Sequence, residues 1–252
     1  MDYGLQKRTW HAVCHEGVDM PDSASLFASP PARWYEEGCS ELPSDAEFDR
    51  IFPDSIRHSS IHHWSTVEVC RHAADWLVTA PGTRVLDVGC GPGKFCAIGA
   101  AFTRGHFTGV EQRRNLCRTA RQVVNYHNIP RVEILHANVT EMAFNLFDAF
   151  YFFNPFQENL MPMLKIDDEV PVEFKYYDRY INYVRKELSS VPLGTRVVTY
   201  WGDCDEIPPC YDCVETAFEE GLRLWIKRRT GEPGKFAHEA CFIPNTCEFS
   251  IA

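Results

Sequence analysis

Residues 85–95 read Val-Leu-Asp-Val-Gly-Cys-Gly-Pro-Gly-Lys-Phe. The apolar start is typical of a buried strand, and it leads into Gly89, Gly91 and Gly93, after which a helical pattern begins. Glycines allow a sharp backbone turn and admit a ligand against bare amides, while the first turn of the helix offers unpaired N–H groups. We therefore expect a ligand to bind at the carboxyl end of this strand.

Two common nucleotide-binding loops match this stretch poorly. The phosphate-binding loop of nucleoside triphosphatases needs four residues between its first glycine and its Gly-Lys pair, followed by Ser or Thr. Here only three residues separate Gly89 from Gly93 and Lys94, and Phe95 follows, so that interpretation fails. A dinucleotide fingerprint requires glycine where the chain has Lys94, which weakens the second interpretation.

Strand-like and helical patterns alternate along most of the chain, which indicates a parallel α/β sheet. A capping box that begins at Ser65 predicts a helix over residues 66–78. Helical periodicity also covers residues 116–127 and 174–188. The expected strands comprise residues 84–88, 106–111, 132–136, 147–154 and 196–201.

The last part of the pattern is different, because two strand-like runs, 213–218 and 222–228, are separated by only three residues. Such spacing predicts an antiparallel hairpin. The fold class we expect is therefore α/β, with a Rossmann-like, seven-stranded, mostly parallel sheet, helices on both faces, a C-terminal antiparallel hairpin and an N-terminal helical or irregular extension.

Composition limits the possible classes of function. The chain has 252 residues, 25 of them Lys or Arg and 35 Asp or Glu, so its net charge is −10. This acidic balance argues against a broad nucleic-acid-binding surface. We expect a cytoplasmic protein without a membrane association, because no apolar run reaches the roughly 18 residues of a membrane span and the N-terminus lacks a secretory apolar region.

An aspartate before Gly-x-Gly-x-Gly resembles the first motif of the class I S-adenosylmethionine-dependent methyltransferases, over roughly residues 65–230. The resemblance implies that S-adenosyl-L-methionine is the cofactor and that the loop binds it through Asp87, Gly89, Cys90 and Gly91. It also implies that residues 59–252 form the methyltransferase domain, preceded by an N-terminal arm and cap segment, residues 1–58. Aromatic residues in that arm predict that it packs on the domain from Trp34 onward.

The resemblance extends to the next two predicted strand ends. It implies that Glu111, followed by Gln112, accepts both ribose hydroxyls of the cofactor, although a strand-end glutamate is also a common surface charge. It further implies that Asn138 meets the adenine amine and that Val139 packs on the ring.

Asn154-Pro155-Phe156, after the fourth predicted strand, resembles the asparagine-proline-aromatic motif of amino-group methyltransferases. That resemblance gives the three residues the catalytic role: the asparagine orients the target nitrogen beside the cofactor, and the aromatic ring packs on the substrate. It also places Asn154 among the cofactor-binding residues. The usual motif has a second proline where this chain has Phe156, and Gln157 stands where the ring would be. A simple turn at Asn154 is the alternative.

The implied activity is N-methyl transfer to an amine or amide nitrogen of a small molecule or a protein side chain. A weaker resemblance to the non-SET class of histone-lysine methyltransferases points to a protein lysine as acceptor, and RNA stays open as a partner. An NAD(P)-dependent oxidoreductase and a non-catalytic binding module with this fold are the alternatives. The oligomeric state is not predicted.

Three further patterns lie outside these motifs. His63 and Trp64 precede the first predicted helix, where a substrate or cofactor lid is expected, although capping or packing is the common role of such residues. Basic runs on the helix after Glu111 and at residues 227–229 could bind an anion or be solvated. A structural zinc site is a weak alternative to our expectation of no metal, and its ligands would come from Cys204, Cys210, Cys213, His238, Cys241 and Cys247.

Overall fold

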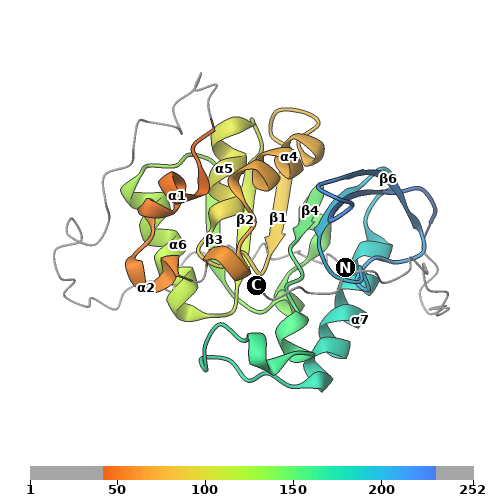
Figure 1. Ribbon diagram of the computed structural model, residues 1–252. Helices are drawn as coiled ribbons and strands as arrows, with labels where there is room; N and C mark the ends of the chain where they lie inside the picture. The colour runs from red at the N-terminus through yellow and green to blue at the C-terminus, as the bar shows by residue number, and fades with distance from the viewer. Residues whose placement is uncertain (1–41, 59, 231–252) are drawn as a thin grey trace, which may run out of the picture.

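Residues 42–58 and 60–230 of the protein are described here from a computed structural model (Figure 1). Its sheet has seven strands in the order β3-β2-β1-β4-β5-β7-β6. Strands β1 to β5 pair in parallel, and β7 runs antiparallel to both β5 and β6. The strands are β1 (Arg84–Val88), β2 (His106–Glu111), β3 (Val132–His136), β4 (Ala149–Phe152), β5 (Arg196–Tyr200), β6 (Tyr211–Ala217) and β7 (Leu222–Lys227). The predicted mixed sheet and its closing hairpin are confirmed.

Four helices account for most of the helical residues, and each predicted helix is present. They are α4 (Val67–Leu77), α5 (Lys94–Phe102), α6 (Arg114–Tyr126) and α7 (Phe174–Ser190). The short elements include α1 (Asp45–Phe48), η2 (Asp49–Ile51), α2 (Asp54–Arg57), α3 (Ser60–His63), η3 (Val139–Glu141), η4 (Phe144–Leu146), η5 (Gln157–Asn159) and η6 (Pro162–Leu164).

The predicted strands 147–154 and 196–201 extend past the carboxyl ends of the observed strands, and the backbone explains why. Asn154 and Trp201 have φ values of 42° and 54°, in the left-handed region that a strand cannot continue through. Strand β4 therefore ends at Phe152 and β5 ends at Tyr200. Both departures fall at the same edge of the sheet.

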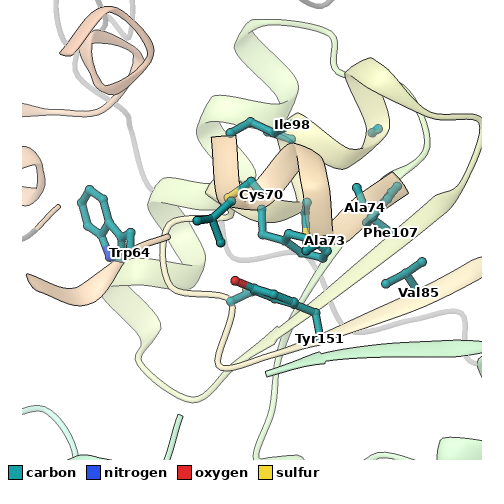
Figure 2. Close-up of a cluster of buried hydrophobic side chains, with 14 of the residues drawn as sticks. Trp64, Cys70, Ala73, Ala74, Val85, Ile98, Phe107 and Tyr151 are labelled. Atoms are coloured by element: carbon teal, nitrogen blue, oxygen red, sulfur yellow. The ribbon is translucent and has the colours of Figure 1, made fainter. Parts of the chain in front are cut away.

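Alternation along β1 separates two apolar layers. Val85 belongs to the layer beneath α4, α5 and α6, whereas Leu86 and Val88 belong to the layer beneath α7. The first layer includes Ile98 and Phe107 (Figure 2). With apolar side chains on both of its faces, β1 lies at the centre of the molecule and its carboxyl end is held firmly.

The described part of the N-terminal segment packs against the same core. Phe48 and Ile51 are fully buried, and Phe52 is nearly so. The ammonium group of Lys94, the first residue of α5, pairs with Asp45 at 2.6 Å and with Asp49 at 2.8 Å. Residues 42–58 are thus joined to the glycine loop by apolar packing and by ion pairs. The predicted contacts of Trp34 lie outside the described residues.

The chain reverses its direction of travel across the sheet between β1 and β4. From β1 it proceeds outward to β2 and β3 and then returns to β4, the other neighbour of β1. Such a reversal leaves room for a ligand beyond the carboxyl ends of the two strands. In the described ranges, no helix combines the length and apolar character needed to cross a bilayer.

Candidate active site

The glycine loop after β1 has the backbone that its sequence predicts. Gly89, Gly91 and Gly93 have φ values of 73°, 54° and 83°. A Cβ atom on Gly89 would lie 2.8 Å from Cβ of Pro155, closer than two such atoms can approach. The loop therefore lies directly against the residues that follow β4, and glycine at residue 89 is what permits the contact.

Glu111, the last residue of β2, connects its strand end to the loop. Its side chain is only 5% exposed, and its two carboxylate oxygens accept hydrogen bonds from the backbone N–H groups of Gly91 (3.0 Å) and Arg113 (2.8 Å). Burial raises the pKa of Glu111, and the hydrogen bonds from these amides act in the opposite direction. Each carboxylate oxygen has a further lone pair, so the group can accept additional donors such as the hydroxyls of a diol.

Asp87 lies one strand away and is also buried. The thiol of Cys96 donates to its Oδ2 atom at 3.4 Å. Burial, with a smaller contribution from the charge of Glu111, raises the pKa of Asp87 to about 7. The neighbouring Cys90 has a thiol whose pKa burial raises well above its usual value, so this sulfur is a neutral packing group.

The residues predicted to meet adenine form a polar network. Asn138 caps η3 by accepting hydrogen bonds on Oδ1 from the backbone N–H and hydroxyl of Thr140. Its Nδ2 atom donates to Oε1 of Gln112 at 3.2 Å and to the hydroxyl of Tyr180 at 3.1 Å. Val139 is buried beside this network. Asn138 thus holds Gln112 and Tyr180 in place, and its contact with adenine stays a prediction.

The Asn154-Pro155-Phe156 motif divides between two environments. Asn154 is partly exposed, and its amide faces Gly202, just beyond β5, where a Cβ atom would lie 2.9 Å from Oδ1. Phe156 is 6% exposed and packs on Tyr180 with ring centroids 5.2 Å apart. Pro155 and Asn154 therefore adjoin the loop and the next strand end, while the Phe156 ring belongs to the apolar layer under α7.

The two lid candidates lie at the end of α3. Trp64 is 9% exposed, and its indole Nε1 atom would be 3.4 Å from a Cβ atom on Gly91. That Nε1–H group is buried and has no hydrogen-bond partner among the described residues. The Trp64 indole therefore lies directly against the glycine loop. His63 is partly exposed, and its place in a lid stays a prediction.

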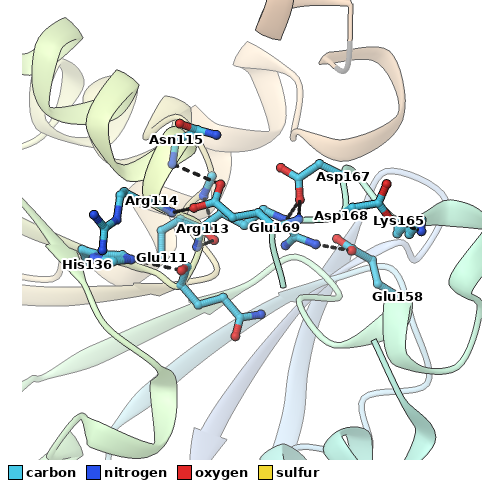
Figure 3. A network of polar contacts seen from close by, with 12 residues as sticks. Glu111, Arg113, Arg114, Asn115, His136, Glu158, Lys165, Asp167, Asp168 and Glu169 are labelled. Atoms are coloured by element: carbon cyan, nitrogen blue, oxygen red, sulfur yellow. Dashed lines mark hydrogen bonds and ion pairs between the residues drawn. The ribbon is translucent and has the colours of Figure 1, made fainter. Parts of the chain in front are cut away.

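Within the basic run after Glu111, Arg113 is committed to contacts within the chain, whereas Arg114, Arg118 and Arg121 are exposed. Arg113 is only 5% exposed and pairs with Glu158 and Asp167, as Figure 3 shows. Glu169 accepts from the backbone N–H groups of Arg114 and Asn115, which occupies the amino end of α6. Arg118 donates to the side chain of Asn115 and Arg121 to a backbone carbonyl. The run holds residues 158–169 against α6.

The second basic run and the zinc alternative give no further site in the described part of the chain. Lys227 is buried and donates to backbone carbonyls of Ser189 and Val191. Among residues 42–58 and 60–230, no three His, Cys, Asp or Glu side chains gather as metal ligands would. The proposed thiols differ in their surroundings, since Cys210 is buried and Cys213 is exposed. His238, Cys241 and Cys247 lie outside the described residues.

Sequence reasoning missed three residues that shape this edge of the sheet. Gly202 confines the Asn154 amide, Tyr180 completes the network around Asn138, and Lys94 anchors the N-terminal segment. A glycine directly after a predicted strand was the available signal for Gly202. Helical periodicity predicts that Tyr180 lies on a helix, but it does not indicate the hydrogen bond with Asn138. Lys94 was recognised only as a departure from the dinucleotide fingerprint.

The arrangement fits an adenosyl cofactor on its own geometry. Three features meet at the carboxyl end of β1: a loop of positive-φ glycines, a buried carboxylate with spare lone pairs, and an indole N–H that has no partner in the part of the chain that the structure describes. Together with the strand order, these features define the fold of the class I S-adenosylmethionine-dependent methyltransferases.

Comparison with known proteins agrees with this class. Residues 85–165 match the family described as methyltransferase domain. Demethylmenaquinone methyltransferases of Listeria welshimeri and Listeria innocua are each 29% identical over 106 residues, which cover 40% of this chain and 45% of theirs. The chain thus matches less than half the length of these curated relatives.

A solved structure extends the likeness to the fold. The crystal structure of TrmN from Thermus thermophilus aligns with a TM-score of 0.50 and 15% identity, over 67% of this chain and 51% of that one. At this level of identity the likeness shows a shared fold.

Proposed function

We propose that the protein is an S-adenosylmethionine-dependent methyltransferase that transfers the methyl group to an amine or amide nitrogen. One observation carries the proposal: Gly89 of the cofactor loop contacts Pro155, so the acceptor motif after β4 adjoins the donor site after β1. Group transfer by direct displacement depends above all on such proximity and orientation.

The cofactor would be held by groups from three strand ends. Glu111 accepts the ribose hydroxyls on lone pairs left over from its bonds to Gly91 and Arg113. Asp87 and the loop residues Gly89, Cys90 and Gly91 line the sulfonium side, and Gln112, Asn138 and Val139 line the adenine side. Bound there, S-adenosylmethionine supplies an electrophilic methyl group.

Asn154 positions the acceptor. Its side-chain oxygen and a neighbouring backbone carbonyl accept hydrogen bonds from the target NH₂ group, which directs the nitrogen lone pair toward the donor. Gly202 leaves the asparagine amide little freedom on one side, because even a Cβ atom there would contact it. Neither residue has to gain or lose a proton, so positioning is the whole of their role.

A small amine or a protein side chain is the acceptor class we favour. The net charge of −10 disfavours a broad polyanion surface, and Arg113 of the basic run is already paired with carboxylates. All the described cysteines are free thiols, which is compatible with the reducing cytoplasm in which we place the protein.

The two alternatives predict different behaviour. An oxidoreductase would bind a nicotinamide dinucleotide, but the residue that its fingerprint requires as glycine is Lys94, a buried cation held by two aspartates. A non-catalytic binding module would bind the cofactor without transferring its methyl group.

Calorimetric titration with S-adenosylhomocysteine, and separately with NAD(P), tests the cofactor assignment. We expect saturable binding of S-adenosylhomocysteine alone, and a folded sample that binds none of it would refute the assignment. Incubation of the protein and methyl-labelled donor with fractionated cell extract then tests the reaction. Label in small amines or protein is expected, label confined to RNA would overturn the acceptor class, and no label in any fraction would favour the binding module.

A further inference from the structure

Trp64 has a polar group that the described residues leave unsatisfied. Its side chain is 9% exposed, and the Nε1–H group is buried without an acceptor among the residues that the structure describes. Nearly all buried donors in folded proteins are paired, because an unpaired one forfeits its bond to water. An isolated buried donor therefore indicates an acceptor that is not part of the chain.

The indole is directed at the glycine loop. Nε1 would lie 3.4 Å and Cδ1 3.6 Å from a Cβ atom on Gly91, the residue whose backbone N–H donates to Glu111 at 3.0 Å. The donor thus lies beside the loop, next to the carboxylate to which we assign the ribose. Figure 2 shows Trp64 set apart from Tyr151 and Cys70, at one side of the apolar cluster.

The ring is held in this position by the N-terminal segment. It packs on Phe52 with ring centroids 5.3 Å apart. The segment is anchored in turn by Asp49, which accepts from the hydroxyl of Ser60 and pairs with Lys94 at 2.8 Å. Because these contacts are buried, the indole is fixed before any ligand arrives.

The charges nearby indicate what kind of acceptor is missing. Lys94 is neutralised by Asp45 and Asp49, and Arg113 is paired with Glu158 and Asp167. These two buried cations are therefore committed elsewhere. An anion beside the loop would not draw on these two cations, and the indole N–H is a neutral donor that faces the loop. The amino-acid end of S-adenosylmethionine carries such an anion, its carboxylate.

We propose that the Nε1–H group of Trp64 donates a hydrogen bond to the carboxylate of the methionine part of the cofactor. The inference rests on the proposed function and adds a specific recognition element to it. Trp64 thereby distinguishes the complete cofactor from adenosyl compounds that lack the amino-acid end. Residues 45–58 and 60–64 act as a cofactor-binding segment rather than as a passive cover.

The test compares two ligands and two variants by calorimetry. Trp64→Phe keeps an aromatic ring but removes the donor, and Trp76→Phe makes the same change on α4, where the indole contacts His72 and Phe218 packs on that histidine. The ligands are S-adenosylhomocysteine and 5′-methylthioadenosine, which lacks the amino-acid end. We expect Trp64→Phe to weaken S-adenosylhomocysteine about tenfold or more and to leave 5′-methylthioadenosine within about twofold, with Trp76→Phe unchanged.

Each possible result either supports the proposal or overturns it. Equal affinity of Trp64→Phe and the wild type for S-adenosylhomocysteine would overturn it while leaving the proposed function intact. Equal weakening of both ligands would also overturn it, because the contact would not involve the carboxylate. If the wild type binds neither ligand, the proposed function fails and takes the inference with it.

A measurement on the unmodified protein covers the case in which Trp64→Phe does not fold. In nitrogen-15 spectra of the wild type, the assigned indole N–H signal of Trp64 should move downfield on addition of S-adenosylhomocysteine and not of 5′-methylthioadenosine. An unmoved signal at saturation with S-adenosylhomocysteine would contradict the hydrogen bond.

Discussion

Gly202 lies against the side-chain amide of Asn154, so that a Cβ atom on the glycine would be 2.9 Å from Oδ1 and 3.0 Å from Cγ. The two residues follow neighbouring parallel strands, β4 and β5, and both have positive φ values, 42° for Asn154 and 83° for Gly202. Left-handed backbone gathered at one strand edge is a feature of binding sites, where strain is offset by the surrounding fold.

Gly202→Ala should therefore impair methyl transfer beyond its effect on stability. The added methyl group displaces the Asn154 amide, and a misplaced positioning group costs on the order of 100-fold in rate. Gly194→Ala is the matched control, because Gly194 has a φ of 84° and nothing within 4 Å of its Cβ position. Both variants should lose about 1–2 kcal/mol in urea unfolding, and equal rates in the two would contradict the contact's role.

Asn154→Ala should reduce the transfer rate about 100-fold and leave the dissociation constant of S-adenosylhomocysteine within about twofold, since the residue positions the acceptor. Asn128→Ala controls for backbone strain, because Asn128 is exposed and has a φ of 50°. Steady-state kinetics and calorimetry on both variants provide the comparison. An Asn154→Ala enzyme as fast as Asn128→Ala would refute the assignment.

Asp87 should make the free energy of unfolding depend on pH in a recognisable direction. Its pKa is raised to about 7, so at pH 5 the folded state retains a proton that the unfolded state has released. The resulting stabilisation is complete below the ordinary carboxyl pKa and is lost as pH rises through 7. Relative to Asp87→Asn, the wild type should lose up to about 1.4 kcal/mol per pH unit between pH 5 and 7.

Urea unfolding at pH 5, 6, 7 and 8 measures this dependence, and Asp148→Asn is its control. Arg84 holds the pKa of Asp148 below its usual value, so that carboxyl titrates below this pH range and its removal should shift all four values equally. A difference between the wild type and Asp87→Asn that is independent of pH would show that Asp87 is ionised throughout.

Lys94→Met should destabilise the protein by about 3–5 kcal/mol, because it leaves the buried carboxylate of Asp49 without a counter-charge. The double variant Lys94→Met/Asp49→Asn should recover part of that loss. Lys165→Met removes a partner of Asp168 at the surface, where both side chains are exposed, and should cost less than about 1 kcal/mol. Similar losses for Lys94 and Lys165 in urea unfolding would contradict this account.

Local sequence patterns are sufficient to predict the main helices and strands and their order along the chain. The strands at residues 84–88, 106–111 and 132–136 were predicted at their observed bounds, because apolar runs and glycines act on the backbone of their own neighbourhood. The position of Glu111 at a strand end, and so at the ligand edge of a parallel sheet, follows from the same local information.

Those local patterns do not predict contacts between residues that are far apart in the chain. The basic residues after Glu111 looked like one solvated face, yet Arg113 is buried because Glu158 and Asp167 reach it from a segment more than forty residues away. The motif gives no indication that the Phe156 ring packs on Tyr180 of α7. Sequence spacing carries no record of such pairings.

By itself, then, the sequence determined a mostly parallel, Rossmann-like sheet, its glycine loop and the acidic strand end, since each depends on backbone preferences within a few residues. Tertiary structure alone decided that Gly202 confines Asn154, that Lys94 anchors the N-terminal segment and that the Trp64 indole faces the loop. These contacts form when the two apolar layers pack on the sheet. A polar group that is buried in this way needs a hydrogen-bond partner, which comes from a residue distant in the sequence or from a ligand.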